Sequence, residues 1–174
     1  MKPSLVIYPD TRLRKVCPPV KRFDASLREL AEEMLKLMVV KRGIGLAGPQ
    51  VGFMHRMFVC NLTGNPEDSM VIINPELVDM VGAEEGEEGC LSLPTVNVPV
   101  RRAEKCIMRA FDLEGTMHEM SGEGLLARVW QHETDHLDGR LILDRTNDTA
   151  KLSVRRTLKD LESKHRSKKA VSPT

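Results

Sequence analysis

The sequence lacks the features that mark several classes of protein. No apolar run approaches the roughly 20 residues that a membrane-spanning helix needs. Residues 1–13 carry charges and a proline where a secretory signal would have an apolar stretch. The four cysteines stand singly, without the paired spacing of a disulfide framework, which favours a reducing compartment. We therefore expect a cytoplasmic protein of bacterial type with no membrane segment, and an organellar origin stays open as the alternative.

Aromatic residues are also scarce. With one Trp, one Tyr and four Phe, the core must be filled by Leu, Val, Ile and the ten Met. A chain of 174 residues is long enough for one domain with one sizeable core. The net charge of +1 is unevenly distributed along the chain, because residues 151–174 carry eight Lys/Arg and only two acidic residues. We interpret the chain as an acidic body with a basic C-terminal segment.

The hydrophobic pattern predicts a single α+β domain. Helices are expected at 26–41, with Ser26 and Glu29 as a capping box, at 123–137, and from 147 or 148 to about 164. Strands are expected at 57–62, 70–73, 76–80, 106–112 and 141–143. Between the first helix and the first strand, the glycines of residues 43–52 predict an irregular backbone. We assign residues 1–166 to the domain and residues 167–174 to a disordered basic tail.

The strongest local signal is the run from His132 to His136, which reads His-Glu-Thr-Asp-His. On a helix, positions 132 and 136 lie one turn apart on one face, so two imidazoles can bind one metal ion with Glu133 beside them as proton carrier. A catalytic metal needs a third protein ligand. Cys90 is the favoured candidate, because it lies between a glycine and an apolar stretch ended by Pro94. The competing interpretation is a chance match with surface histidines.

Three segments, in the same order, resemble the motifs of peptide deformylases. Residues 43–50 resemble the family's Gly-x-Gly-Leu-Ala-Ala-x-Gln loop, residues 88–92 match Glu-Gly-Cys-Leu-Ser, and residues 131–136 match Gln-His-Glu-x-Asp-His. The resemblance covers about residues 5–145. The chain departs from the family pattern at Gly48, where alanine is usual, and at Thr134, where an apolar residue is common. Neither departure removes a reacting group.

The resemblance implies a role for each matching position. The metal ligands would be Cys90, His132 and His136; Glu133 would be general base and acid; Gln50 and the backbone N–H of Leu91 would stabilise the oxyanion; and Gly45 would touch the substrate backbone. The implied activity is hydrolysis of the N-formyl group of N-formylmethionyl nascent peptides, which releases formate. The implied fold has short antiparallel strands packed around a central metal-binding helix, with N-terminal and C-terminal helices. The implied cofactor is one divalent ion, natively iron(II), although zinc, nickel and cobalt also suit a thiolate with two imidazoles.

An apolar pocket is needed for the methionine side chain, and Ile44, Leu125 and Val129 are the candidates for its lining. The competing interpretation for these residues is ordinary core packing. Asp135 with Arg101 and Arg102 either supports the segment that bears Cys90 or forms a surface ion pair of little energetic value.

Two other functions stay open at this point. A zinc peptidase also uses His-Glu-x-x-His, and its third ligand would come from the last helix, for example Glu162. A non-catalytic binding protein with the same fold is the second, although the intact Cys90, Glu133 and Gln50 argue against it. The basic C-terminal helix is a candidate for contact with the ribosome, because clustered Lys/Arg bind backbone phosphates; a solvated helix is the alternative.

Overall fold

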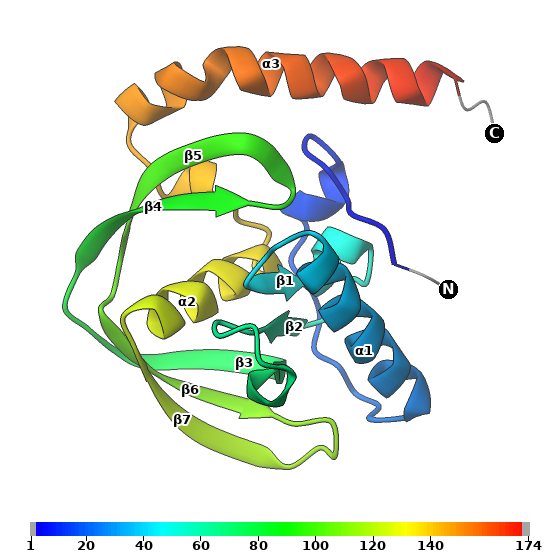
Figure 1. The fold of residues 1–174 in the computed structure, drawn as a ribbon, viewed down its shortest axis with the longest axis vertical. Helices are drawn as coiled ribbons and strands as arrows, with labels where there is room; N and C mark the ends of the chain where they lie inside the picture. The colour runs from blue at the N-terminus through cyan, green and yellow to red at the C-terminus, as the bar shows by residue number, and fades with distance from the viewer. Residues whose placement is uncertain (1–2, 172–174) are drawn as a thin grey trace.

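The computed structural model describes residues 3–171, which form three α-helices and two antiparallel sheets (Figure 1). The helices are α1 (Ala25–Val40), α2 (Leu125–Leu137) and α3 (Asp148–Val171). The larger sheet has the order β1-β2-β3-β6-β7. Its strands are β1 (Gly45–Ala47), β2 (Met57–Cys60), β3 (Met70–Val81), β6 (Lys105–Phe111) and β7 (Met117–Glu123). The strands β4 (Glu84–Cys90) and β5 (Leu93–Arg102) pair only with each other in the described sheets. The mixed single-domain fold predicted from the sequence is confirmed.

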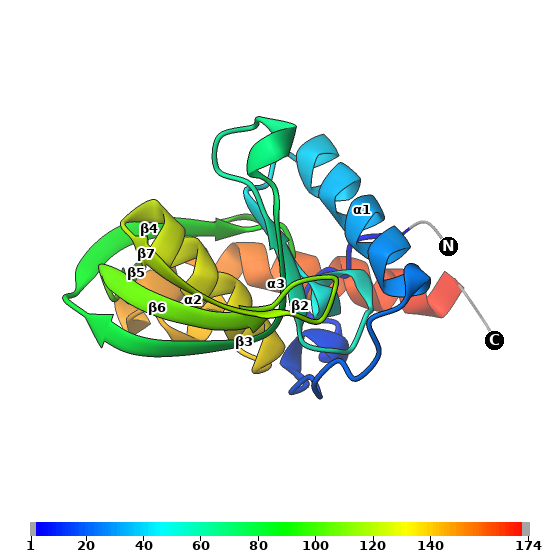
Figure 2. The ribbon, with the colours of Figure 1, turned by 90° about the horizontal axis from the view of Figure 1, so that it is seen from below.

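Helix α2 lies between the two sheets (Figures 1 and 2). One side of the helix buries Ala127, Trp130 and Leu137 in a cluster with apolar residues of β2, β3 and β6. The other side faces the β4–β5 hairpin, to which it is joined by hydrogen bonds from Arg128 and His132. The helix is therefore central, as expected, and both of its faces are covered by strands.

Helix α1 forms where the sequence predicts it, but a different residue caps it. Its buried residues Leu27, Ala31, Met34 and Met38 recur at helical spacing and pack against β1 and β2. The predicted capping box of Ser26 and Glu29 is wrong. Asp24 is the N-cap, and its carboxylate accepts hydrogen bonds from the Leu27 N–H and the Ser26 hydroxyl.

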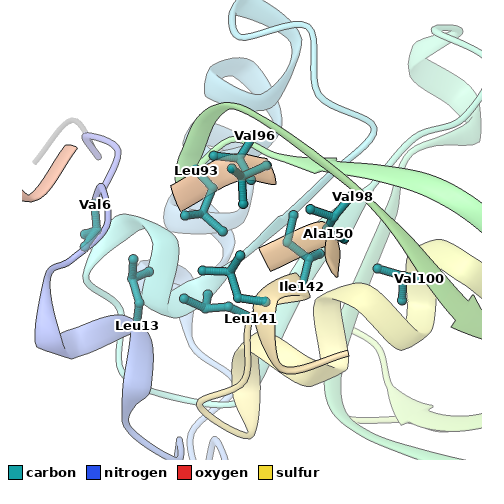
Figure 3. Packing of buried hydrophobic residues seen from close by; sticks show 11 residues of the cluster. Val6, Leu13, Leu93, Val96, Val98, Val100, Leu141, Ile142 and Ala150 are labelled. Carbon is teal, nitrogen blue, oxygen red and sulfur yellow. The ribbon is translucent and has the colours of Figure 1, made fainter. Parts of the chain in front are cut away.

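Helix α3 packs against the body of the protein through apolar residues that recur at helical spacing. Ala150 and Val154 are buried, and Leu158 and Leu161 are partly buried against the same cluster. Figure 3 shows this cluster, in which Ala150 of α3 and Ile142 lie beside Val98 and Val100 of β5. The helix continues beyond the cluster and lies across β5 at the edge of the molecule (Figure 1). Residues 167–171, assigned from the sequence to a disordered tail, continue this helix, and residues 172–174 lie outside the described residues.

The strand predictions are less complete than the helix predictions. Four strands were not expected from the sequence, namely β1, β4, β5 and β7, and β1 lies within residues 43–52, where an irregular backbone was predicted. The two strands expected at 70–73 and 76–80 are one strand, β3, whose register shifts between Ile73 and Glu76 around Pro75. The strand expected at 141–143 is wrong, because Ile142–Asp144 form a 3-10 turn in which Asp144 accepts a hydrogen bond from the Leu141 N–H. A short apolar run has no period that separates a strand from a helical turn.

Within residues 3–171, no helix has the combination of length and hydropathy that crossing a bilayer requires.

Candidate metal centre

Three side chains from two distant parts of the chain meet between α2 and the β4–β5 hairpin. Cys90, His132 and His136 each offer one ligand atom, and these atoms all lie within 4.8 Å of one another. The Cys90 Sγ lies 3.3 Å from His136 Nε2, and the two imidazole rings are 5.0 Å apart between centroids. A single ion with bonds of about 2.0–2.3 Å to nitrogen and sulfur fits a donor set of this size. No other group of three such residues is found in the described part of the chain.

The turn of the β4–β5 hairpin carries Cys90 to the helix. The regular pairing of the hairpin is interrupted between Gly89 and Cys90, so that Cys90 pairs with Leu93. A Cβ at position 89 would lie 2.6 Å from the Asn97 side-chain oxygen, which explains the glycine. The irregular pairing bends the chain between Gly89 and Cys90 and thereby determines the position of the Cys90 thiol.

A buried carboxylate orients one of the two histidines. Glu88 Oε2 lies 2.9 Å from His132 Nδ1, and Arg102 Nε and Nη2 each donate to the same carboxylate over 2.9 Å. Although burial opposes its charge, the hydrogen bonds from His132 and Arg102 lower the pKa of Glu88 to about 2. An anionic Glu88 holds the proton of His132 on Nδ1, which leaves Nε2 free to bind a metal.

Arg102 links this carboxylate to the helix that bears both histidines. Its Nη1 donates to Asp135 Oδ2 over 2.5 Å, and Arg145 Nη2 donates to Asp135 Oδ1 over 2.6 Å. Arg102 and Asp135 are each 5% exposed. The surface ion pair considered from the sequence is therefore wrong for this pair, which is buried. Arg101 is exposed and takes no part in the network.

Glu133 lies against the backbone of β1. It is buried, and a Cβ added at Gly45 would lie 2.2 Å from Glu133 Oε1, so only glycine lets the strand approach so closely. Burial raises the pKa of Glu133 to about 7. Its Oε2 has no hydrogen-bond partner among the described residues. A carboxyl with a free oxygen at a cleft is suited to proton transfer.

Gln50 is held in one orientation by the loop that precedes it. Its Oε1 accepts a hydrogen bond from the Ala47 N–H over 2.7 Å. Its Nε2 therefore points toward the hairpin, where it lies 3.2 Å from Ser92 Oγ and 3.5 Å from Cys90 Sγ. Leu91, the residue after the thiol, lines the same space.

These groups lie along one cleft of about 750 Å³. Its lining includes nine of the ten site residues expected from the sequence: Ile44, Gly45, Gln50, Cys90, Leu91, Leu125, Val129, His132 and Glu133. The tenth, His136, lies deeper and is buried. The core-packing interpretation is wrong for Leu125, which is 53% exposed, but it holds for Val129, which is 5% exposed and belongs to the apolar cluster around Trp130. Glu162, the alternative ligand, accepts a hydrogen bond from the Tyr8 hydroxyl and belongs to no such ligand group.

Two residues of the site, Glu88 and Arg128, were not predicted from the sequence. Glu88 lies in one of the three motifs, but the motif alone implies no role for its side chain. Arg128 donates to Glu88 Oε1 over 2.9 Å and lines the cleft. Its position four residues before His132 was a signal for this, because residues at that spacing share a helix face.

Comparisons with known proteins agree with this geometry. The family described as Polypeptide deformylase matches residues 3–152. A peptide deformylase from Alkalilimnicola ehrlichii is 44% identical over 159 residues, 91% of this chain and 89% of the relative. One from Dictyoglomus thermophilum is 48% identical over 136 residues, 78% of this chain and 87% of the relative.

Solved structures are similar along most of the chain. A peptide deformylase from Legionella pneumophila is 40% identical with a TM-score of 0.87, covering 99% of this chain and 100% of that one. A peptide deformylase from Plasmodium falciparum is 32% identical with a TM-score of 0.92, covering 94% of this chain and 98% of that one. The sequence, the fold and the relatives agree, and the chain belongs to the polypeptide deformylase family.

Proposed function

We propose that this chain carries out the reaction of its family, hydrolysis of the N-formyl group from the first methionine of nascent proteins with release of formate. The family is metal-dependent, and the chain is a hydrolase of this kind. The observation that carries the proposal is the cluster of Cys90, His132 and His136, whose ligand atoms lie within 4.8 Å of one another beside the cleft.

The three clustered residues would hold one divalent ion, His132 through Nε2 because its Nδ1 faces Glu88. Such an ion lowers the pKa of water toward neutrality and polarises a carbonyl oxygen. We propose iron(II) as the native ion. Zinc, nickel and cobalt also suit one thiolate with two imidazoles, so the ligand types alone do not choose among them.

Glu133 is proposed as the proton carrier. Its carboxylate would take a proton from the attacking water and later deliver it to the nitrogen of the departing methionine. Two observations support this role: the contact of Glu133 with Gly45 at the cleft, and the carboxylate oxygen without a described hydrogen-bond partner. Both observations support a role for this carboxyl group in proton transfer between water and substrate.

Gln50 and Leu91 are proposed as the donors to the oxyanion that forms at the formyl carbon. The Gln50 amide oxygen is occupied by the Ala47 N–H, so its NH₂ group faces Cys90. The Leu91 N–H follows the thiol directly in the chain. Donors fixed before the reaction stabilise a developing charge without reorganisation. A formyl carbon carries only hydrogen, so a tight space beside these donors would exclude larger acyl groups.

The remaining cleft residues are proposed to bind the peptide. The backbone of Gly45 would contact the substrate backbone, and Ile44, Leu125 and Val129 would surround the methionine side chain. Ile44 and Leu125 are exposed at 40% and 53% although both are large and apolar. Their exposure at a cleft supports a binding role, because an apolar ligand would cover them.

The proposal is tested with a formyl-Met peptide and its acetyl-Met counterpart, on protein purified without oxygen and analysed for metal. We expect release of formate from the first peptide, no hydrolysis of the second, and about one metal ion per chain. Metal-loaded protein that leaves the formyl peptide intact, or that cleaves internal peptide bonds, would reject the assignment.

We further propose that α3 contacts the ribosome, from which the substrate emerges. We also propose that residues 1–166 suffice for catalysis and that the protein acts in the cytoplasm. The basic charge of the helix and its projection beyond the core support the contact. The four free cysteines fit a reducing compartment. Neutralising Arg155, Arg156, Lys159 and Lys164 should weaken ribosome co-sedimentation, with less salt dependence than the wild type. Deleting residues 167–174 should leave peptide turnover unchanged. Equal co-sedimentation of the neutralised variant would remove the contact.

A further inference from the structure

Arg128 places a charged group in the wall of the cleft, beside the apolar residues that we assign to the methionine side chain. It lies three residues after Leu125 and four before His132 on α2, so the three share one side of the helix. All three line the cleft. The side chain of Arg128 is only 12% exposed.

The hairpin holds the guanidinium group in place. Nη1 donates to Glu88 Oε1 over 2.9 Å and to the Val100 carbonyl over 3.0 Å. Nη2 donates to the Glu84 carbonyl over 2.9 Å. With three acceptors on β4 and β5, the group is fixed before any ligand binds, and its position does not depend on substrate.

Gly86 provides the space that the guanidinium occupies. Glu84, Gly86 and Glu88 alternate along β4, so they point to one face of the hairpin, the face toward α2. A Cβ at position 86 would lie 3.1 Å from Arg128 Cζ and 3.1 Å from Nη2. A larger apolar side chain at this position would occupy the space now taken by the Arg128 guanidinium. Because residue 86 is glycine, the arginine forms this part of the cleft wall.

The fixed guanidinium retains hydrogen-bonding capacity. Its Nε–H and the second Nη2–H have no acceptor among the described residues. Arginine has donors and no acceptor, so a ligand atom that meets it there must be an acceptor. Arg128 lines the cleft, so an aliphatic ligand that covered these N–H groups would leave them unpaired, which is unfavourable.

We propose that Arg128 makes this chain a deformylase of N-formylmethionine sulfoxide peptides as well as of N-formylmethionine peptides. The inference rests on the proposed function, since it names a further substrate of the same site. A thioether sulfur is a weak acceptor, whereas the sulfoxide oxygen is a strong one that a guanidinium N–H can bind. The hydrolysis itself is unchanged: water adds to the formyl carbon, the C–N bond breaks, and formate and the free amine leave.

The test compares a formyl-methionine sulfoxide peptide with a formyl-norleucine peptide of the same length. The measured quantity is the ratio of their kcat/KM values on metal-loaded protein. We expect Arg128→Met to lower this ratio by about tenfold, the scale of one hydrogen bond to a charged group. Arg128→Lys keeps the charge near Glu88 but has one nitrogen in place of a fork, and should lower the ratio as well. Arg101→Met, which removes an exposed arginine outside the cleft, should keep the wild-type ratio.

A binding measurement separates this inference from the proposed function. The deformylated product peptides, with methionine sulfoxide or norleucine in first place, are titrated by calorimetry into the wild type and the three variants. The ratio of their Kd values should change in the same order as the kinetic ratio. If the wild type hydrolyses no formyl peptide, the proposed function and the deformylation of the sulfoxide peptide both fail, and binding of the products in this order leaves Arg128 only as the residue that selects a sulfoxide. If folded Arg128→Met and Arg128→Lys keep both wild-type ratios, the inference is overturned.

Discussion

Glu133 is the residue on which the proposed chemistry depends most directly. In Glu133→Ala, the ligand cluster of Cys90, His132 and His136 is untouched, so we expect metal content near that of the wild type. The loss of proton transfer should lower kcat by about 10²–10⁴. Turnover of a formyl-Met peptide and metal analysis check this. The matched control is Glu119→Ala, an exposed glutamate on β7. A variant with bound metal and near wild-type kcat would remove Glu133 from the mechanism.

The second prediction for a single residue concerns Gln50, the proposed donor to the oxyanion. Gln50→Ala should lower kcat by roughly 10²–10³ with unchanged metal content, the usual cost of one oxyanion donor. The same substitution leaves the Ala47 N–H without its acceptor, so the thermal unfolding of the variant must be measured alongside. An increase in KM alone, with kcat preserved, would assign Gln50 to substrate binding instead.

At the scale of elements, one buried arginine holds the hairpin that bears Cys90 against the helix that bears His132 and His136. Arg102 of β5 donates to Glu88 of β4 and to Asp135 of α2, and the side chains of all three are at most 7% exposed. Removing one partner from such a group leaves charges buried without compensation. The network therefore ties the position of His132 to the stability of the fold.

Arg102→Met should lower the free energy of unfolding by about 3–5 kcal/mol, because Glu88 and Asp135 would lose a buried partner. Arg101→Met, at the next position of the same strand but exposed, should change it by no more than about 0.5 kcal/mol. Urea unfolding of the metal-free proteins measures both. Similar midpoints for the two variants would mean that the buried network adds little stability.

At the scale of the whole molecule, a metal ion held by the proposed ligands would join the hairpin to the helix and would decide how long activity lasts in air. Iron(II) with an open coordination position reacts with oxygen, and the nearby thiolate can be oxidised to sulfenic or sulfinic acid. Iron-loaded protein should therefore lose activity in air, while nickel or cobalt should slow the loss. Zinc should leave a folded but less active protein. Time courses of turnover in air and under nitrogen test this, and equal decay with every metal would contradict it.

Cys90→Ser tests the ligand set itself. A mostly protonated hydroxyl replaces a soft thiolate, so the variant should bind metal weakly although His132 and His136 are intact. Metal content after dialysis is the measurement, with Cys106→Ser as a control at a buried cysteine outside the cluster. Full occupancy in Cys90→Ser would show that the third ligand lies elsewhere.

Local patterns in the sequence determined the parts of the protein that short stretches encode. The i, i+4 spacing of His132 and His136 predicts two imidazoles on one helix face, and the apolar period of residues 25–40 predicts α1. The three motifs identified the family, and with it the fold and the reaction. Helices were predicted better than strands, because a helix forms its hydrogen bonds within one segment.

Only the tertiary structure decided what depends on distant segments. The acid-rich β4 and the polar β7 show little apolar alternation, and they are strands because of their partners β5 and β6. The approach of Cys90 to His136 depends on that hairpin, as do the bonds of Glu88 and Arg128. The need for glycine at position 45 is explained only by the tertiary structure, because a Cβ there would clash with the Glu133 carboxylate. Pairing between distant segments is set by how the whole chain packs, which no local pattern encodes.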